Sequence, residues 1–443
     1  MNNRTMYDID QAGGIPYPET EKYYYDKWFT TSGLTDGDEY KTIRFNVRQD
    51  NLLLHWTNAY LVLDGKLVKK AAEARYGNDD LITLTHNAVP LMFSNVKLTI
   101  GNKVVENVNE IGHVSSLIHN VLLPRSKGKC DGLEFMWYPD TASTAVEADN
   151  KGFKIRRNFI ITQPATNGNF KLKIPLFMFF GMMENFVLLK GYPVELEMVR
   201  GPDYPAIFRG ATADEGKLKF SSISLEIPIV HPSNQVALQY IKLVKDPQPF
   251  LYTFRERHGM FATVPDGIQD FQQPICSSYF TERPQMIFVG FQGDSNVVDQ
   301  TKNKALFHHA NVESMYIQMN NTQFPPVQQK ANWGENDSGF FYEMQKHARA
   351  NYLQYPARYT EGNMLTPASF KTLYTIYAFD VSKQELTLGS NNVTCNLYVH
   401  FSVATAANLR VYIAYFNDRT LELFTDGSPI NIRKQVDNYQ TPE

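Results

Sequence analysis

Apolar residues that alternate with polar ones, in many short segments, constrain the fold of this chain more than any other feature. The clearest segment has Ile223, Leu225, Ile227 and Ile229 at every second position. A period of two is that of a β-strand with one buried face. Similar segments begin at Ile43, Tyr60, Val96, Phe170, Val194, Tyr252, Met286, Met315, Leu373, Leu397 and Leu409. We therefore predict an all-β protein built from short antiparallel strands.

The length of the chain predicts two domains. A single ordinary core does not extend over 443 residues, and hydrophobic residues at 43% are sufficient for two cores. The 29 Phe and 25 Tyr residues favour strands over helices. The predicted division is an N-terminal arm at 1–40, a first β-domain at 41–231, a linker with a helical pattern at 232–246, a second β-domain at 247–425 and a tail at 426–443.

Residues 245–291 mark the start of the second domain. An aromatic-rich strand follows Pro247 and Pro249, and a turn at Pro265-Asp266-Gly267 precedes another strand that ends at Gly290. A strand, a turn and a second strand, in this order, are expected at the start of a new β-domain.

A repeated spacing indicates that both domains share one topology. The strands at Phe170 and Val194 are 24 residues apart, and so are those at Leu373 and Leu397. Two successive units of short strands with long insertions predict two tandem eight-stranded antiparallel jelly-roll β-sandwiches, with short helices in loops and between the domains.

One helix is predicted inside the first domain. Asn107 and Glu110 have the spacing of a capping box, and an apolar face runs from Ile111 to Leu122 before Pro124 ends it. A second helical pattern follows Ser233 in the linker. The long segment 292–367 is polar and aromatic, and such long loops usually carry function or contacts. Trp333, in this loop, is therefore a candidate interface residue.

Composition argues against several classes of function. A net charge of −3 does not favour a protein that condenses nucleic acid, so no specific nucleic-acid binding is expected. Three scattered cysteines offer neither a disulfide framework nor zinc spacing, which favours a reducing compartment. No secretion signal and no run of 18 apolar residues is present, so no transmembrane segment is expected.

No catalytic, cofactor or metal site is predicted. The segment 210–218 has the wrong glycine spacing for a phosphate loop and reads as a surface turn. Neighbouring His308 and His309 point to opposite faces of a strand, which disfavours a shared ion. The segment 179–183 reads as a buried turn, and the basic run 66–75 reads as a solvated face.

The cluster Arg255-Glu256-Arg257-His258 lacks a nucleophile at a recognisable spacing. A solvated or interface salt-bridge patch is the better interpretation. Arg255, Arg257 and His258 are therefore candidate interface residues.

Three stretches of the chain carry a resemblance to a known family. The first is Ile174-Pro175-Leu176 with Phe180-Gly181 and the strand VELEMV. The second is the turn at Pro265 and Gly267 with the strand from Pro284 to Gly290. The third is Phe379-Asp380 with the strand pair that ends at Asp418. In this order and spacing they resemble the double jelly-roll major capsid proteins of the adenovirus-like lineage, most closely the polinton and adintovirus group and its copies in animal genomes.

The resemblance implies a structural protein without catalytic activity or cofactor. It implies a homotrimer that forms a pseudo-hexameric capsomer, and capsomers that tile an icosahedral shell around a DNA genome. Neighbouring capsomers and penton or minor capsid proteins would be its partners, and the virion its location, with assembly in the nucleus or the cytoplasm of the host cell. Two alternatives remain: a host-resident capsid-derived scaffold or binding protein, and a carbohydrate-binding tandem β-sandwich.

Overall fold

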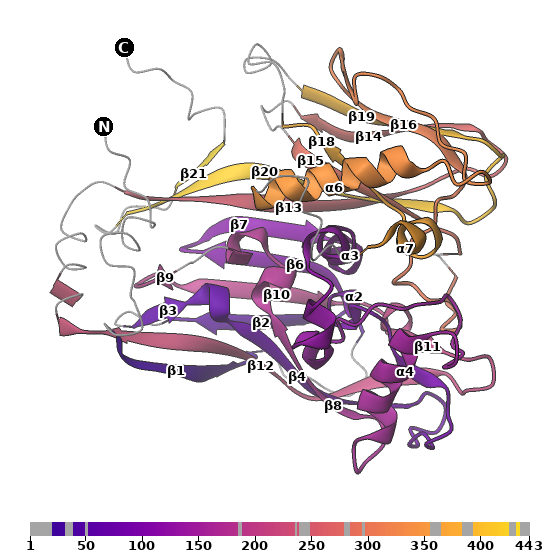
Figure 1. Ribbon diagram of the computed structural model, residues 1–443. Helices are drawn as coiled ribbons and strands as arrows, with labels where there is room; N and C mark the ends of the chain where they lie inside the picture. Colours follow the sequence, from indigo (N-terminus) through magenta and orange to yellow (C-terminus); the bar gives the residue numbers. More distant parts are fainter. Residues whose placement is uncertain are drawn as a thin grey trace, which may run out of the picture.

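The computed structural model shows two β-sandwiches, one above the other in the view of Figure 1. The residues that it describes are 20–31, 39–48, 52–184, 188–234, 237–238, 249–278, 284–294, 297–354, 365–382, 393–424 and 431–434. Most of the predicted linker at 232–246 lies outside these residues.

The first sandwich consists of two main sheets with a small strand pair at its side. One sheet contains β1 (Thr20–Phe29), β12 (Gly216–Pro232), β3 (Leu53–His55), β4 (Tyr60–Lys69), β8 (Asn169–Pro175) and β9 (Leu188–Leu189). The other contains β2 (Thr42–Val47), β10 (Val194–Arg200), β6 (Phe93–Ile100) and β7 (Lys103–Asn109). The small pair is β5 (Ile82–Leu84) with β11 (Ile207–Arg209).

The second sandwich also consists of two sheets. One contains β13 (Phe250–Thr263), β20 (Arg410–Leu423), β15 (Pro284–Gln292) and β18 (Ile376–Asp380), with β21 (Asn431–Lys434) paired to β20. The other contains β14 (Asp270–Ser278), β19 (Val393–Phe401), β16 (Val312–Met319) and β17 (Thr322–Phe324).

Both sandwiches have the same strand order. If β3 with β4 counts as one strand, and β8 with β9 as another, each sandwich has eight main strands in the order 1-8-3-6 in one sheet and 2-7-4-5 in the other. This is the jelly-roll topology, so the predicted fold class is confirmed. The equal spacing noted in the sequence does not hold for the strands themselves. Phe170, Val194 and Leu397 lie within β8, β10 and β19, whereas Leu373 lies in a turn before β18 begins at Ile376.

The alternation that predicted the strands is also the alternation of burial. Ile223, Leu225, Ile227 and Ile229 of β12 are at most 2% exposed, while the even-numbered Ser222 and Glu226 lie on the other face and are partly exposed. One large hydrophobic cluster fills the first sandwich and continues onto the facing side of the second, and another fills the interior of the second.

The helices lie in the connections between strands. Those that lie wholly within the described residues are α2 (Ala88–Leu91), α3 (Ile111–Leu122), α4 (Lys151–Arg157), α6 (Gly339–Leu353) and α7 (Pro367–Thr372). Short 3₁₀ turns include η2 (Trp56–Asn58), η6 (Leu176–Met178), η7 (Gly181–Glu184) and η8 (Tyr204–Ala206). The connection 292–367 was expected to be mainly loop, and α6 lies within it.

Helix α3 was predicted, but its capping box was wrong. Asn107 still belongs to strand β7, and Glu110 has a left-handed backbone (φ 51°) with no side-chain cap. The strand continues to Asn109, so the chain reverses at Glu110 instead of entering the helix from an extended N-cap.

The two ends of the chain differ from the irregular arm and tail that the sequence predicted. Residues 20–29 form β1, which pairs along β12 and is the first strand of the first sandwich. Residues 431–434 form β21. The rest of the tail, residues 1–19 and residues 32–38 lie outside the described part of the chain.

Candidate functional site: the seam between the two sandwiches

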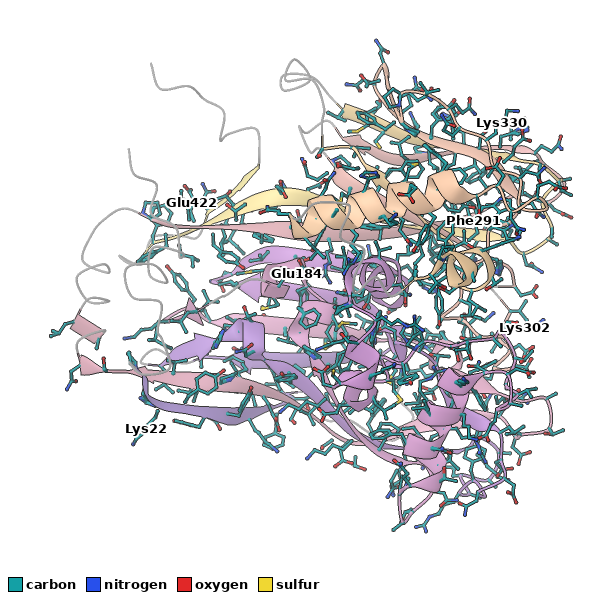
Figure 2. All side chains as sticks on the ribbon, viewed as in Figure 1. Lys22, Glu184, Phe291, Lys302, Lys330 and Glu422 are labelled. Carbon is teal, nitrogen blue, oxygen red and sulfur yellow. The ribbon has the colours of Figure 1, made fainter. Side chains whose placement is uncertain are left out.

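The two sandwiches meet along a seam that brings together distant parts of the sequence. The first sandwich contributes β7, α3 and η7, and the second contributes β13, β15 and β20 (Figure 1). Figure 2 labels Glu184 of η7, which lies between the two sandwiches. We call this set of elements the seam.

Two glycines allow the backbones to come close at the seam. A Cβ atom on Gly181 would lie 1.8 Å from the carbonyl oxygen of Arg255. A Cβ atom on Gly259 would lie 2.2 Å from Cγ2 of Val114 and 2.4 Å from the carbonyl oxygen of Asn109. Any larger residue at either position would push the sandwiches apart.

A buried carboxylate joins three segments at the seam. Glu106 of β7 is 0% exposed. Its Oε1 accepts hydrogen bonds from the backbone N–H groups of Gly181 at 3.0 Å and Arg257 at 2.9 Å, and its Oε2 accepts one from Met182 at 3.3 Å. Because buried backbone donors are costly to leave without an acceptor, this one side chain fixes η7 and β13 to β7.

A buried cation lies beside this carboxylate. Arg257 is 1% exposed, and its Nη2 donates to Glu184 and lies 3.3 Å from Nε2 of His119. The hydroxyl of Tyr352 in α6 donates to the other oxygen of Glu184. The guanidinium charge is thereby compensated within the chain, as burial requires.

The seam holds two groups with displaced pKa values. Burial raises the pKa of Glu106 to about 7, although the Arg257 cation and the three N–H donors favour the carboxylate. Burial lowers the pKa of His119 well below its ordinary value, and the Arg257 cation lowers it further. Because His119 stays neutral, it can lie against an arginine without repulsion.

A groove of about 860 Å³ runs along one side of the seam. Residues from both sandwiches line it, among them His119, Phe177, Glu184, Arg255, Tyr352 and Asp418. The guanidinium carbon of Arg255 lies 3.9 Å from the ring centre of Tyr352, and its Nη2 donates to the carbonyl oxygen of Tyr352 at 3.2 Å. These contacts hold α6 against β13.

Comparison with known proteins places this architecture in a family. A family model described as the double jelly roll-like domain matches residues 141–421, which is more than half of the chain. The chain belongs to the double jelly roll-like family. No curated protein matches the sequence.

Solved structures share the double jelly-roll fold over nearly the whole chain. The cryo-EM structure of the Sputnik virophage matches with a TM-score of 0.62 and 11% identity, covering 96% of this chain and 92% of that chain. The mavirus major capsid protein matches with a TM-score of 0.55 and 10% identity, covering 97% and 93%. The Faustovirus major capsid protein matches with a TM-score of 0.52 and 9% identity, covering 91% and 90%. The last two are capsid proteins by name, a structural and non-enzymatic class.

The residues that carried the resemblance lie in the core, at the seam and in a surface turn of this double jelly-roll protein. Ile174 and Pro175 end β8, Leu176 begins η6, and all three are buried. Phe180 is buried beside Gly181 of the seam. At the seam side of β15, a Cβ on Gly290 would lie 2.7 Å from Cδ2 of Leu117. In the same sandwich Pro284 and Phe379 are buried, and Asp380 ends β18.

The turn at Pro265 and Gly267 was predicted correctly. Gly267 has a φ of +74°, a left-handed conformation that favours glycine. Its N–H donates to the carbonyl oxygen of Thr405 at 2.9 Å, while the Thr405 hydroxyl donates to the carbonyl oxygen of Pro265 at 2.6 Å. The turn is thereby tied to the strand connection opposite.

Two of the four candidate interface residues, Arg257 and Trp333, are buried, and the other two, Arg255 and His258, are partly exposed. Arg257 is buried at the seam, which differs from the expected exposed contact surface. Trp333 is 7% exposed in the core of the second jelly roll, where its Nε1 donates to the carbonyl oxygen of Val312 at 2.7 Å. His258 stacks on Tyr415 and lies 3.4 Å from Glu256, and Arg255 is partly exposed in the groove.

The weaker motifs occupy structural positions. Residues 210–215 join β11 to β12, and residues 216–218 are the first of β12. Residues 179–183 are buried at the start of η7. Nε2 of His308 accepts from the Gly293 N–H at 2.6 Å, while His309 stacks on Trp333. In the basic run, Lys69 and Lys70 pair with Asp214 and Glu215.

Neither a metal site nor a membrane helix is found in the described part of the chain. It contains no group of three or more His, Cys, Asp and Glu residues that could hold a metal ion. Its helices are all too short or too polar to cross a membrane.

Sequence reasoning missed Glu106, Glu184 and His119. Their partners are far away in the sequence: Glu106 meets Arg257 across 151 residues, and His119 meets it across 138. A local signal existed only for His119, which lies among the apolar residues of the predicted helix face.

Proposed function

We propose that this chain is the major capsid protein of a DNA virus of the polinton and adintovirus group. Three copies form a pseudo-hexameric capsomer, and capsomers tile an icosahedral shell together with penton or minor capsid proteins. The observation that carries the proposal is the repetition of one jelly roll within the chain, divided at about residues 232–246. Three chains then supply six similar units, which suits a closed ring with threefold symmetry.

The contact between subunits is inferred from the contact within the chain. The connection between the fifth and sixth strands of the first jelly roll contains α3, which covers the outer face of the β13-β20-β15 sheet. That face is apolar, with Phe288, Ala378 and Ala414 in the large hydrophobic cluster. The equivalent sheet of the first jelly roll is β1-β12-β4-β8.

The outer face of this equivalent sheet carries an aromatic and charged cluster, which we call the lateral patch: Tyr25, Lys27, Tyr60, Lys173 and Glu226. Nζ of Lys173 lies 4.5 Å and 4.8 Å from the ring centres of Tyr60 and Tyr25, and 3.0 Å from Glu226. Tyr25 is 44% exposed. Tyrosine side chains such as those of Tyr25 and Tyr60 are enriched in protein interfaces.

We infer that the lateral patch receives the second jelly roll of a neighbouring copy. In the second jelly roll, the connection between the fifth and sixth strands, β17 and β18, contains α6 and α7. It is the equivalent of the connection that contains α3, and it is the segment that reaches the lateral patch. Each chain then contributes one contact inside the chain and one between chains, and the ring closes with three copies.

Native mass spectrometry tests this proposal. Wild-type protein should give a mass of three chains of 50.8 kDa each. Lys173→Glu should give monomers with an unchanged circular dichroism spectrum, because Lys173 is partly exposed and Glu226 keeps its second partner, Lys27, at 3.2 Å. Lys154→Glu, on the exposed side of α4, is the matched charge-reversal control and should leave the trimer intact.

The outcomes separate the two parts of the proposal. A wild-type protein that stays monomeric at high concentration contradicts the capsomer. A trimer that survives Lys173→Glu contradicts the lateral patch and leaves the capsomer in place.

A further inference from the structure

A small cavity lies at the far end of the seam from the large groove. Its volume is about 150 Å³, and both jelly rolls line it. The polar lining residues are Ser94, Glu110, His113, Tyr204, Lys304 and Arg410, and the ring of Tyr412 forms one wall. The cavity is separate from the cluster around Glu106 and Arg257.

Two cations of the second jelly roll line this cavity. Lys304 is 4% exposed, and its Nζ donates to the carbonyl oxygen of Asp294. Nε of Arg410 is fully buried and has no hydrogen-bond partner among the described residues. The guanidinium carbon of Arg410 lies 4.9 Å from the ring centre of Phe261, which holds the side chain in place. A buried donor without a partner indicates that a ligand or water accepts from it.

The first jelly roll contributes a helix N-terminus to the same cavity. Helix α3 has 12 residues and begins at Ile111, and Gly112 and His113 of its first turn line the cavity. No side chain caps this end of the helix. The first N–H groups of a helix and its dipole together favour a bound anion.

The acidic groups near the cavity have other partners, although Glu110 also attracts Arg410, and Asp294 and Asp299 also attract Lys304. Glu110 is one-third exposed, and its Oε2 lies 3.4 Å from Nδ1 of His113. The carboxylate of Asp294 pairs with Lys302 at 3.6 Å. Asp299 accepts from the Thr301 N–H and hydroxyl, each at 2.8 Å. His113 stacks on Tyr412 with ring centres 3.7 Å apart. Lys304 and Arg410 therefore outnumber the one carboxylate that lines the cavity.

We propose that this cavity binds a small tetrahedral oxyanion, phosphate or sulfate. Arg410 and Lys304 donate from the second jelly roll, and the start of α3 donates from the first. The volume of about 150 Å³ is below the roughly 300–1,000 Å³ of pockets that hold drug-sized ligands, and it suits an ion of five heavy atoms. A bound oxyanion would link the two jelly rolls at the end of the seam that Glu106 does not reach.

Titration calorimetry with sodium phosphate and with sodium sulfate, at constant ionic strength set by sodium chloride, tests the site on the full-length protein. Both oxyanions should bind with a stoichiometry of one per chain. At a hundredfold excess over Kd, each should raise the Tm by about 3 °C over chloride alone, because a ligand of the folded state stabilises it by mass action.

Matched variants locate the binding. Lys304→Met and Arg410→Gln should each weaken phosphate binding at least tenfold. Lys302→Met, two residues from Lys304 but 55% exposed and outside the cavity lining, should bind phosphate as the wild type does.

Several results would overturn the proposal. The first is that the wild-type protein shows no saturable binding of phosphate or sulfate. The second is that chloride raises the Tm as much as the oxyanions do, and the third is that Lys304→Met binds phosphate as tightly as the wild type. If a variant does not fold, the wild-type calorimetry and the Lys302→Met comparison still decide whether a specific site exists.

Discussion

The carboxylate of Glu106 accepts a hydrogen bond at 2.9 Å from the backbone N–H of Arg257, and this contact joins the fifth strand of one jelly roll to the first strand of the other. Two more N–H donors from η7 complete the contact. A polar residue thus links the two halves of the chain, and a large apolar cluster extends across both halves. A fixed relative position of the halves is what a capsomer with six similar units requires.

Replacing Glu106 by alanine should destabilise the monomer strongly. The substitution leaves three buried N–H groups without an acceptor, and the Arg257 guanidinium loses a nearby negative charge. We expect the free energy of unfolding to fall by about 3–5 kcal/mol, measured by urea denaturation. Glu335→Ala, at an exposed position, should change it by less than about 0.5 kcal/mol. A Glu106→Ala protein as stable as the control would show that the carboxylate does not hold the seam.

The raised pKa of Glu106 predicts a defined pH dependence. The unfolded pKa is 4.5 and the folded pKa is about 7, so the folded state binds more protons between these values. Stability from this group is therefore fully present below pH 4.5 and is lost as the pH rises towards 7. A shift of this size corresponds to at most roughly 3–4 kcal/mol.

The difference between wild type and Glu106→Gln isolates this contribution. His119 acts in the opposite direction, because its lowered pKa costs stability as the pH falls below 6.5, but it is present in both proteins. Denaturation at several pH values should show that the wild type gains stability relative to Glu106→Gln on acidification from pH 7 to 4.5. A difference that stays constant over this range would contradict the raised pKa.

Gly181→Ala should separate the two jelly rolls. The added Cβ would lie 1.8 Å from the carbonyl oxygen of Arg255, a backbone atom that can move only with its strand. We expect a loss of about 2–3 kcal/mol in unfolding free energy and a weaker trimer in native mass spectra. Gly339→Ala is the control, because no heavy atom lies within 4 Å of its added Cβ. It should be neutral or slightly stabilising, and equal behaviour of the two variants would argue against close approach at η7.

Charge reversal should distinguish Arg257 from Arg255. Arg257→Glu would place a third carboxylate beside Glu106 and Glu184, and we expect a loss of more than about 4 kcal/mol or failure to fold. Arg255→Glu removes a partly exposed guanidinium from the Tyr352 ring and should cost about 1–2 kcal/mol. Thermal unfolding of the two variants tests whether Arg257→Glu lowers the Tm more than Arg255→Glu does. If both fold normally and lose only assembly, these arginines form a surface for another subunit.

The sequence predicted the strands and their repetition well because period-two burial is a local property. It did not predict β1, whose aromatic and charged residues face both ways along a strand that pairs with β12 at one edge of the described sheet. The burial of Glu106 could not be predicted from a local sequence pattern either. A register shift between Leu98 and Thr99 places Val105 and Glu106 both in buried positions, and this breaks the alternation. Arg257 and Trp333 were assigned to surfaces because their compensating contacts are distant in sequence.

Electron microscopy of the purified protein tests the central proposal most directly. Class averages should show particles of three chains with a pseudo-hexagonal outline, in which six similar lobes surround one threefold axis. The second jelly roll of each chain should then lie against the lateral patch of its neighbour. Single two-lobed particles at every concentration, with no threefold assembly, would contradict the proposal that this chain builds a capsomer.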